Sequence, residues 1–252
     1  MSNSRSKEIA VNSNEAKPIA LVYRGPAGDC DDCSKALKTL LEGATRWNFK
    51  VIYVGPKGEM PVEDGLKLQD AVLYAQPGGN DDEDKAFNFL KEFAPEVRKF
   101  VQNGGRYLGT CMGAYFAGNS KEFPGFDLGL KVDQYIKTPE ATVTSEEDTI
   151  VQVNWKIQTG PQAGQTITRW MYFQDGPYFI PEKGKHGQII LAKYMTDYVV
   201  AMVQPYGSGW IGVCGTHPEA DVSWYKEFCI IDSDSLDADL GHDLINTLMM
   251  QT

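Results

Sequence analysis

The sequence has few histidines and no long apolar run, and both shortages narrow what the chain can do. Only three of its 252 residues are histidine, so few side chains can accept a proton near neutral pH. No stretch approaches the roughly 18 apolar residues of a membrane-spanning helix, and the opening MSNSRSKEIAVNSNEAKP lacks the apolar centre of a secretory signal. We therefore expect a cytoplasmic protein that does not bind membranes.

Basic residues are scarce as well. The chain has 24 Lys and Arg against 34 Asp and Glu, and no basic stripe that follows a phosphate backbone. We therefore expect a small-molecule substrate and no nucleic-acid partner. Hydrophobic residues make up 42% of the chain, so we predict a single domain over residues 18–252 behind a disordered tail at 1–17. The oligomeric state stays open, with a homodimer as one option.

The first half of the chain alternates short apolar strands with helical segments. Pro95 lies inside the second helical segment and predicts that it is kinked or split. Strands that alternate with helices form parallel sheets covered on both faces, so we predict that architecture here. The predicted strands are 19–23, 49–54, 71–75 and 107–108, and the predicted helices are 34–47 and 84–103.

The pattern changes after about residue 123. Strands then follow one another without helices, which indicates an antiparallel β-rich segment from about 123 to 205. The predicted fold is therefore α/β, with a mostly parallel central sheet and an antiparallel β-rich insertion. The strands expected in the insertion are 149–157, 168–173, 188–194 and 199–204, followed by a last strand at 211–215 and a last helix at 239–250.

The strongest local signal is Gly109-Thr110-Cys111-Met112-Gly113, where a predicted strand turns into a helix. Such a nucleophile elbow holds its central residue in a strained conformation, and flanking glycines remove the Cβ atoms that would clash. The free N–H groups of the following helix favour the thiolate, the form of cysteine that attacks carbon. Cys111 is therefore the predicted nucleophile, and a buried cysteine in a glycine-rich turn is the alternative.

A thiol nucleophile needs a base, and the base needs a group that orients it. His217 follows the last apolar strand and stands two residues before Glu219, whereas His186 and His242 lie in polar surroundings. We predict His217 as the base and Glu219 as its partner in a Cys-His-Glu triad. A solvated loop is the alternative interpretation of His-Pro-Glu alone.

The third signal is Pro77-Gly78-Gly79 at the end of a predicted strand. Glycines at the carboxyl edge of a parallel sheet allow backbone N–H groups to approach a ligand, although a plain turn has the same pattern. We predict that the N–H groups of Gly79 and Met112 form an oxyanion hole.

Together these motifs resemble a known family. The order PGG, GxCxG and HPE is similar to class I glutamine amidotransferase domains, which implies a flavodoxin-like three-layer sandwich, a Cys-His-Glu triad and a reaction at an amide. The more detailed resemblance, over about residues 19–225, is to the family named after the N-terminal domain of fungal biotin-protein ligases. It rests on YRGP at 23–26, PGG at 77–79, GGRYLGTCMGAYFAG at 104–118, YFQDGPYF at 172–179 and GTHPEA at 215–220.

Tyr115 departs from the amidotransferase pattern, which has Gln four residues after the nucleophile. Glutamine is therefore not the expected substrate, and Tyr115 and Gly78 are candidates for substrate contacts. The resemblance also places residues 174–178, a turn by their Gly-Pro content, near the site. Asp175 and Tyr178 are further candidates for substrate contacts.

Cys30 and Cys33 form a C-x-x-C motif on the loop after the first strand. A redox pair is one interpretation, and half of a metal site is another. A zinc site needs four ligands, and the sequence has no second C-x-x-C, so we expect no metal and no cofactor.

The expected function is a cysteine-dependent amide hydrolase, or an acyl or amido transferase, that acts on a small molecule through a thioester on Cys111. One alternative is a non-catalytic ligand-binding or regulatory module with the same pocket. Another is a hydratase or lyase similar to isocyanide hydratases, which lack an HPE pair in this position.

Overall fold

The structure is a computed structural model that describes residues 16–28, 31–79, 82–231 and 234–252. The predicted tail at 1–17 lies almost entirely outside the described residues. In chain order the elements are β1 (Ile19–Tyr23), η1 (Pro26–Gly28), α1 (Asp31–Gly43), β2 (Lys50–Val54), α2 (Val62–Gly65), β3 (Ala71–Gln76), α3 (Glu83–Asn88), α4 (Ala94–Gln102), β4 (Arg106–Thr110), α5 (Met112–Tyr115), β5 (Lys131–Gln134), η2 (Tyr135–Lys137), β6 (Thr149–Lys156), β7 (Thr166–Phe173), β8 (Pro177–Ile180), β9 (Ile189–Tyr194), β10 (Val199–Tyr206), β11 (Gly209–Cys214), α6 (Val222–Glu227) and α7 (Ala238–Met249).

The described strands form one sheet, whose main path has the order β2-β1-β3-β4-β11-β10-β9-β6-β7. The five strands from β2 to β11 pair in parallel. From β11 onward the pairs β11–β10, β10–β9, β9–β6 and β6–β7 are antiparallel, and β8 joins β5 to β10. The antiparallel pairing expected for residues 123–205 is therefore present. However, these strands extend the central sheet because β10 pairs directly with β11.

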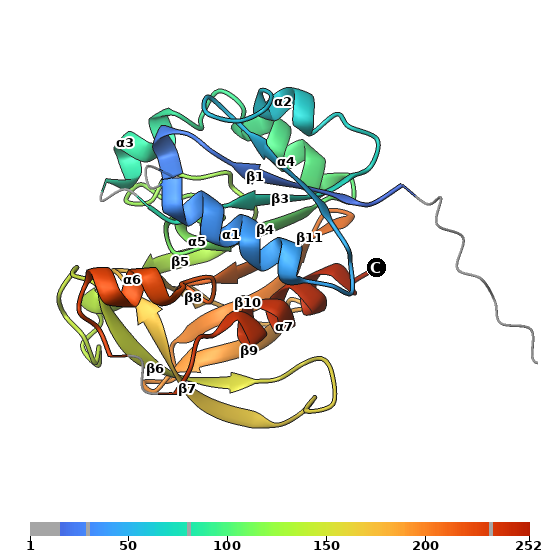
Figure 1. Ribbon diagram of the computed structural model, residues 1–252. Helices are drawn as coiled ribbons and strands as arrows, with labels where there is room; N and C mark the ends of the chain where they lie inside the picture. The colour runs from blue at the N-terminus through green and yellow to red at the C-terminus, as the bar shows by residue number, and fades with distance from the viewer. Residues whose placement is uncertain (1–15, 29–30, 80–81, 232–233) are drawn as a thin grey trace, which may run out of the picture.

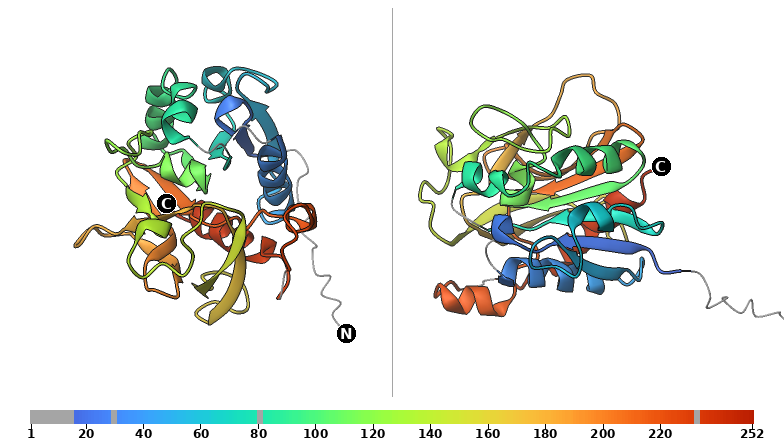
Figure 2. Two further views of the ribbon diagram at one scale, coloured as in Figure 1. Left: turned by 90° about the vertical axis from the view of Figure 1, so that its left-hand side faces the viewer. Right: turned by 90° about the horizontal axis from the view of Figure 1, so that it is seen from above.

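Helices cover both faces of the parallel part, which gives three layers (Figure 1). Seen from above, α1 lies on one side of the strands and α4 on the other (Figure 2). The alternation of β1 explains this arrangement: Ala20 and Val22 pack in a core with α1 and α7, whereas Leu21 and Tyr23 pack in a second core with α4. No helix in the described residues is long and apolar enough to cross a bilayer.

Most predicted elements are present, with two informative differences. The helix expected at 84–103 is split into α3 and α4, and Pro95 lies in the first turn of α4. The turn expected at residues 174–178 is shorter, because β8 already begins at Pro177 and pairs with β5. The sequence pattern did not reveal β5, β8, α2 or α6.

Asp243 on α7 forms hydrogen bonds with residues at the end of β6 and just after it. Its buried carboxylate accepts hydrogen bonds from Trp155 Nε1 at 2.9 Å, from the backbone N–H of Gln158, and from the backbone N–H and hydroxyl of Thr159 at 2.8 and 2.7 Å. This side chain therefore organises the point where the antiparallel strands meet the helical layer.

Replacing Asp243 with Ala is expected to lower the free energy of unfolding by about 3 kcal/mol or more, because several buried donors then lose a charged acceptor. Urea denaturation of Asp243→Ala measures the change, with Asp64→Ala, which alters an exposed carboxylate, as the control. A loss below about 0.5 kcal/mol, the range of ordinary surface substitutions, contradicts this role.

Candidate active site

Cys111 occupies the single residue between β4 and α5. Its φ of 48° and ψ of -114° lie outside the helical and strand regions, a strain of about 1–3 kcal/mol that persists only when the surroundings hold it. Both flanking glycines are sterically required: a Cβ on Gly109 would clash with the carbonyl oxygen of Gly113, and one on Gly113 with that of Gln76. The turn expected from the sequence is therefore present, with the cysteine at the carboxyl end of the parallel strands.

His217 and Glu219 follow β11, the neighbour of β4 in the sheet. Nδ1 of His217 lies 3.0 Å from Oε1 of Glu219, and their side chains are 3% and 0% exposed. Thr110, the residue before Cys111, donates its hydroxyl to the same Oε1 at 2.8 Å. The ring of His217 packs edge-on against Trp224, with centroids 5.1 Å apart. These contacts fix the orientation of the imidazole.

Gly78 lies against both Cys111 and His217. A Cβ on Gly78 would be 2.7 Å from Cε1 of His217 and 3.2 Å from Cβ of Cys111. The loop after β3 therefore brings its backbone to the place where the thiol and the imidazole meet. The absent side chain is what permits this approach.

The charges around His217 favour its protonated form. Burial lowers the pKa of His217, but the negative charges of Cys111 and Glu219, together with hydrogen bonds to both, outweigh burial and raise it to about 10. An imidazolium next to Cys111 stabilises a thiolate. The structure also holds Cys111 Sγ 3.3 Å from the carbonyl oxygen of Gln174, to which a protonated thiol donates.

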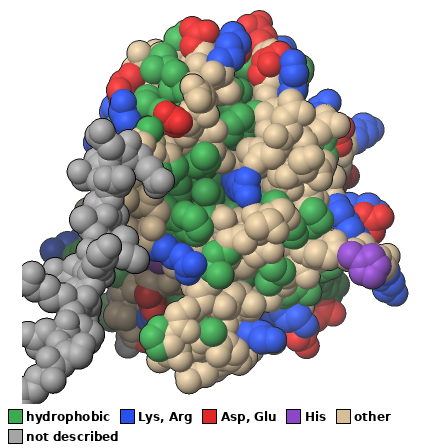
Figure 3. All heavy atoms as spheres, turned by 90° about the vertical axis from the view of Figure 1, so that its right-hand side faces the viewer, with side chains coloured by type: hydrophobic (Ala, Val, Ile, Leu, Met, Phe, Trp, Pro, Cys, Tyr) green, Lys and Arg blue, Asp and Glu red, His purple; other side chains and the backbone are tan. Residues whose placement is uncertain are grey.

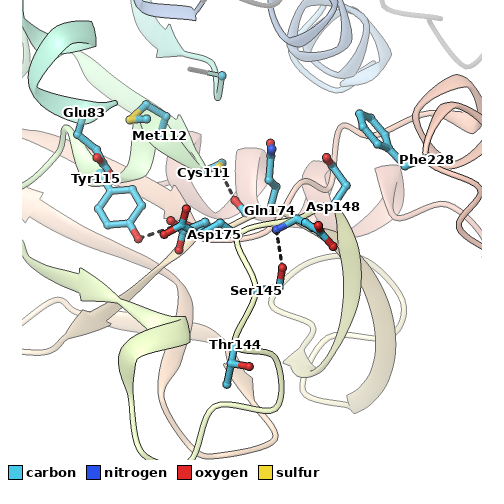
Figure 4. Close-up of a pocket in the computed structure, with 13 residues that line it drawn as sticks. Glu83, Cys111, Met112, Tyr115, Thr144, Ser145, Asp148, Gln174, Asp175 and Phe228 are labelled. Carbon is cyan, nitrogen blue, oxygen red and sulfur yellow. Dashed lines mark hydrogen bonds between the residues drawn. The ribbon is translucent and has the colours of Figure 1, made fainter. Parts of the chain in front are cut away.

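A pocket of about 840 Å³ opens above Cys111 (Figure 4). Its volume lies within the usual range for small-molecule sites. Its walls come from the segments after β3 and β4, from α3, from the loop before β6, from the loop between β7 and β8, and from Phe228 after α6. The described lining residues are Gly79, Glu83, Cys111, Met112, Tyr115, Thr144, Ser145, Glu146, Glu147, Asp148, Gln174, Asp175 and Phe228.

Asp175 forms part of the pocket wall in a constrained conformation, with φ at 44°. Its Oδ2 accepts a hydrogen bond from Gln134 Nε2 at 2.6 Å, and its backbone carbonyl accepts one from the hydroxyl of Tyr115 at 3.0 Å. Burial first, and then the charges of Glu146 and Glu83, raise the pKa of Asp175 to about 6, against the opposing effects of Gln134 and Lys137.

Tyr115 supports the loop that carries Gln174 and Asp175, and its side chain is almost completely buried. Tyr115→Phe is expected to lower the free energy of unfolding by about 1 kcal/mol, because the carbonyl of Asp175 loses its donor. Thermal denaturation of the two proteins measures the change. A variant as stable as the wild type contradicts this supporting role.

The structure brings most of the predicted site residues together. Cys111, His217 and Glu219 lie together, and Gly79 and Met112, the predicted oxyanion-hole residues, line the pocket beside Cys111. Tyr115 and Asp175 line it as well, whereas Gly78 lies against the Cys111–His217 contact. Tyr178 is not among the described lining residues. Its hydroxyl donates to Asp133 at 3.3 Å, so a substrate contact for Tyr178 stays a prediction without support from this geometry.

The C-x-x-C motif is described only in part. Cys33 is disulfide-bonded, whereas Cys111, Cys214 and Cys229 are free thiols. Cys30 lies outside the described residues, so the proposed redox pair stays a prediction. Among the described residues, no group of three or more His, Cys, Asp or Glu side chains is arranged to hold a metal ion.

Sequence reasoning missed several residues of the site. Thr110 stands directly before the predicted nucleophile, so its position on the same strand end was a usable signal. Gln134 and Gln174 gave no signal because their roles depend on pairing between distant segments. The acidic stretch Glu146-Glu147-Asp148 was visible in the sequence, but its place over the pocket was not.

Comparison with solved structures identifies the class of fold. The chain superimposes on a glutamine amidotransferase from Thermotoga maritima with a TM-score of 0.56 at 15% identity, covering 93% of this chain and 97% of that one. A glutamine amidotransferase from Methylobacillus flagellatus gives a TM-score of 0.54 at 13% identity, covering 93% of this chain and 91% of that one. The fold is therefore that of class I glutamine amidotransferases, as expected.

Sequence comparison adds a second, more specific similarity. Residues 19–135 match the model of the family described as "Biotin-protein ligase, N terminal". The biotin-protein ligase of Schizosaccharomyces pombe is 26% identical over 160 residues, which cover 58% of this chain. The chain spans about a quarter of that relative's length, since the match covers 25% of it. The predicted resemblance to the biotin-protein ligase N-terminal family is confirmed over residues 19–135, and the predicted resemblance to glutamine amidotransferases is confirmed for the fold.

Proposed function

We propose that the protein is a cysteine-dependent amide hydrolase or acyl transferase that acts on a small molecule. The observation that supports this most strongly is the meeting of three segments at one point. Cys111 stands on its strained turn, His217 lies across Gly78 from it, and Glu219 holds His217 at 3.0 Å. An amidotransferase-like fold is compatible with this chemistry.

The first half-reaction forms a thioester. The thiolate of Cys111 attacks the carbonyl carbon of the amide, and the resulting oxyanion accepts hydrogen bonds from the N–H groups of Met112 and Gly79. Because Nδ1 of His217 is held by Glu219, the Nε2 proton of the imidazolium goes to the leaving amine as the C–N bond breaks. This leaves an acylated Cys111 and a neutral imidazole.

The second half-reaction releases the acyl group. Water or a second amine attacks the thioester carbonyl, and its proton passes to Nε2 of His217. The C–S bond breaks, the acid or the new amide leaves, and the thiolate–imidazolium pair is restored. Glu219 keeps the imidazole in one orientation through both steps.

Glutamine is not our proposed substrate. The position that carries Gln in the resembled amidotransferases is Tyr115 here, and its hydroxyl is already engaged by the carbonyl oxygen of Asp175. The substrate therefore makes other contacts in the pocket.

A second candidate function is ligand binding without turnover. It is favoured by the 3.3 Å contact between Cys111 Sγ and the carbonyl oxygen of Gln174. A thiol that donates to this carbonyl is protonated and does not attack. In that case the same pocket serves as a recognition site.

Acylation by p-nitrophenyl acetate tests the proposal, because the leaving group is coloured and the acetyl group stays on the nucleophile. We expect a stoichiometric burst of p-nitrophenol and an acetyl group that peptide mapping places on Cys111 and that hydroxylamine removes. Cys111→Ala is expected to lose the burst, and Cys229→Ala, which removes an exposed free thiol, to keep it. A burst that persists in Cys111→Ala contradicts acyl transfer through Cys111. A wild-type protein without a burst favours the binding function.

A further inference from the structure

The pocket above Cys111 is strongly acidic. Five of its thirteen described lining residues carry carboxyl groups, and none is Lys, Arg or His. In the whole chain, by contrast, 34 of 252 residues are acidic and 24 are basic. The five come from three separate segments, so a local run of sequence does not explain them. They are Glu83 on α3, Glu146, Glu147 and Asp148 before β6, and Asp175 after β7.

Among the described residues, protein cations neutralise only part of this charge. Within the described residues, no salt bridge joins any of the five carboxylates to a Lys, Arg or His. Lys137 acts on Glu83 and Asp175 from outside the lining, and it lowers the pKa of both carboxyls. Burial nevertheless raises both values, with further increases from Asp82 and Asp84 for Glu83 and from Glu146 and Glu83 for Asp175.

The few neutral donors leave acceptor atoms unused. Asp175 Oδ2 receives a hydrogen bond from Gln134, whereas its Oδ1 is buried without a partner among the described residues. Asp148 receives one from the hydroxyl of Tyr172 at 2.5 Å. An arrangement of like charges with so few donors is costly, and a cation in the pocket relieves the repulsion.

The opposite end of the molecule has a different surface. Figure 3 shows that face with hydrophobic and basic side chains across its centre and acidic ones mostly toward the edges. The pocket is also lined by Cys111, Gly79 and Met112, the proposed nucleophile and oxyanion donors, and Gly78 lies against both Cys111 and His217.

We propose that the pocket above Cys111 takes a cationic substrate, a small amide that carries an ammonium or guanidinium group. That the substrate is an amide rests on the proposed function. That the substrate is a cation rests on the charge of the pocket alone. A metal ion is not the expected occupant, because no three carboxylates among the described residues are arranged to hold one. An extended organic cation does not need three carboxylates at one point. It can reach from the thiol to the carboxylates in the loop before β6 and contact them one at a time.

Charge-matched thiol reagents test the preference at the thiol itself. The aminoethyl, methyl and sulfonatoethyl methanethiosulfonates each transfer their S-alkyl group to a thiolate and release methanesulfinate. Peptide mass spectrometry gives the rates at Cys111 and at the exposed Cys229, which serves as the internal reference. At low ionic strength we expect the cation-to-anion rate ratio at Cys111 to exceed that at Cys229 by about tenfold or more, and to fall in high salt.

Variants identify the source of the preference. Glu83→Gln and Asp175→Asn are expected to lower the ratio at Cys111, whereas Glu96→Gln, which changes a carboxylate that lines a different pocket, is expected to leave it unchanged. Equal ratios at the two cysteines, or fastest labelling by the neutral reagent, overturn the proposal. The second result indicates a polar uncharged substrate.

A binding measurement keeps the inference testable even if Cys111 is unreactive. N-(4-aminobutyl)acetamide and 4-acetamidobutanoate are amides of similar size and opposite charge, and their affinities for Cys111→Ala are measured by calorimetry. Tighter binding of the cationic amide supports the proposal, and equal or tighter binding of the anionic amide, or binding of neither, overturns it. Because this variant has no nucleophile, the result is independent of whether the proposed reaction occurs.

Discussion

His217→Ala is expected to slow acylation of Cys111 by about 10²–10⁴-fold. In the proposed mechanism, the variant loses the cation that stabilises the thiolate and the acid that protonates the leaving group. Both functions depend on the same ring, whose pKa the charges of Cys111 and Glu219 raise. The burst rate with p-nitrophenyl acetate reports mainly the first function, and turnover of an amide reports both.

The control for this variant is His186→Ala, which removes an exposed histidine outside the described pocket lining. Added imidazole is expected to restore part of the rate of His217→Ala, because truncation of a buried side chain leaves space for the ring. Restoration distinguishes a chemical role from a structural one. Unchanged acylation in His217→Ala contradicts the assignment.

Gly78→Ala is expected to reduce acylation by about 10²-fold or more, since a displacement of about 1 Å at a reacting group can have that effect. The new methyl group would be 2.7 Å from Cε1 of His217 and 3.2 Å from Cβ of Cys111, so one of the two side chains must move. The ring of His217 has little room to retreat, because Glu219 and Trp224 hold it.

A matched control separates this local effect from general overpacking. Gly212→Ala places a Cβ 3.1 Å from Cδ2 of Leu248, in the core between β11 and α7. Both variants are expected to lose about 1–3 kcal/mol of stability through overpacking, but only Gly78→Ala should lose acylation. Equal activities in the two variants contradict the placement of Gly78 between the reacting groups.

The local signals in the sequence were sufficient to predict the strands of the parallel half of the fold. The run IALVY predicted β1 with the bounds that the structure has, since a strand buried on both faces is continuously apolar. The glycines around Cys111 predicted the turn because the steric requirement lies within a few residues. His217 and Glu219 then lay close to Cys111 because β4 and β11 are neighbours whose ends meet at one sheet edge.

Features that depend on distant packing were not predictable from local patterns. β5 and β8 are four residues each, and the Gly-Pro content of residues 174–178 favoured a turn over the strand that begins at Pro177. Gln134 reaches Asp175 only because β5 pairs with β8. The acidic stretch 146–148 lies over the pocket only because β6 adds to the far part of the sheet. The acidity of the pocket therefore needed the structure.

The pH dependence of Cys111 alkylation by iodoacetamide tests the central claim most directly. Because the pKa of His217 is raised to about 10, its ring stays protonated through the neutral range, and in the proposed mechanism this cation stabilises a thiolate on Cys111. We predict a nearly constant labelling rate from about pH 6 to about pH 9, whereas the rate of N-acetylcysteine, like that of any free thiol below about pH 8.5, rises roughly tenfold per pH unit. A Cys111 rate that follows N-acetylcysteine through this range would contradict the activated nucleophile on which the proposed function depends.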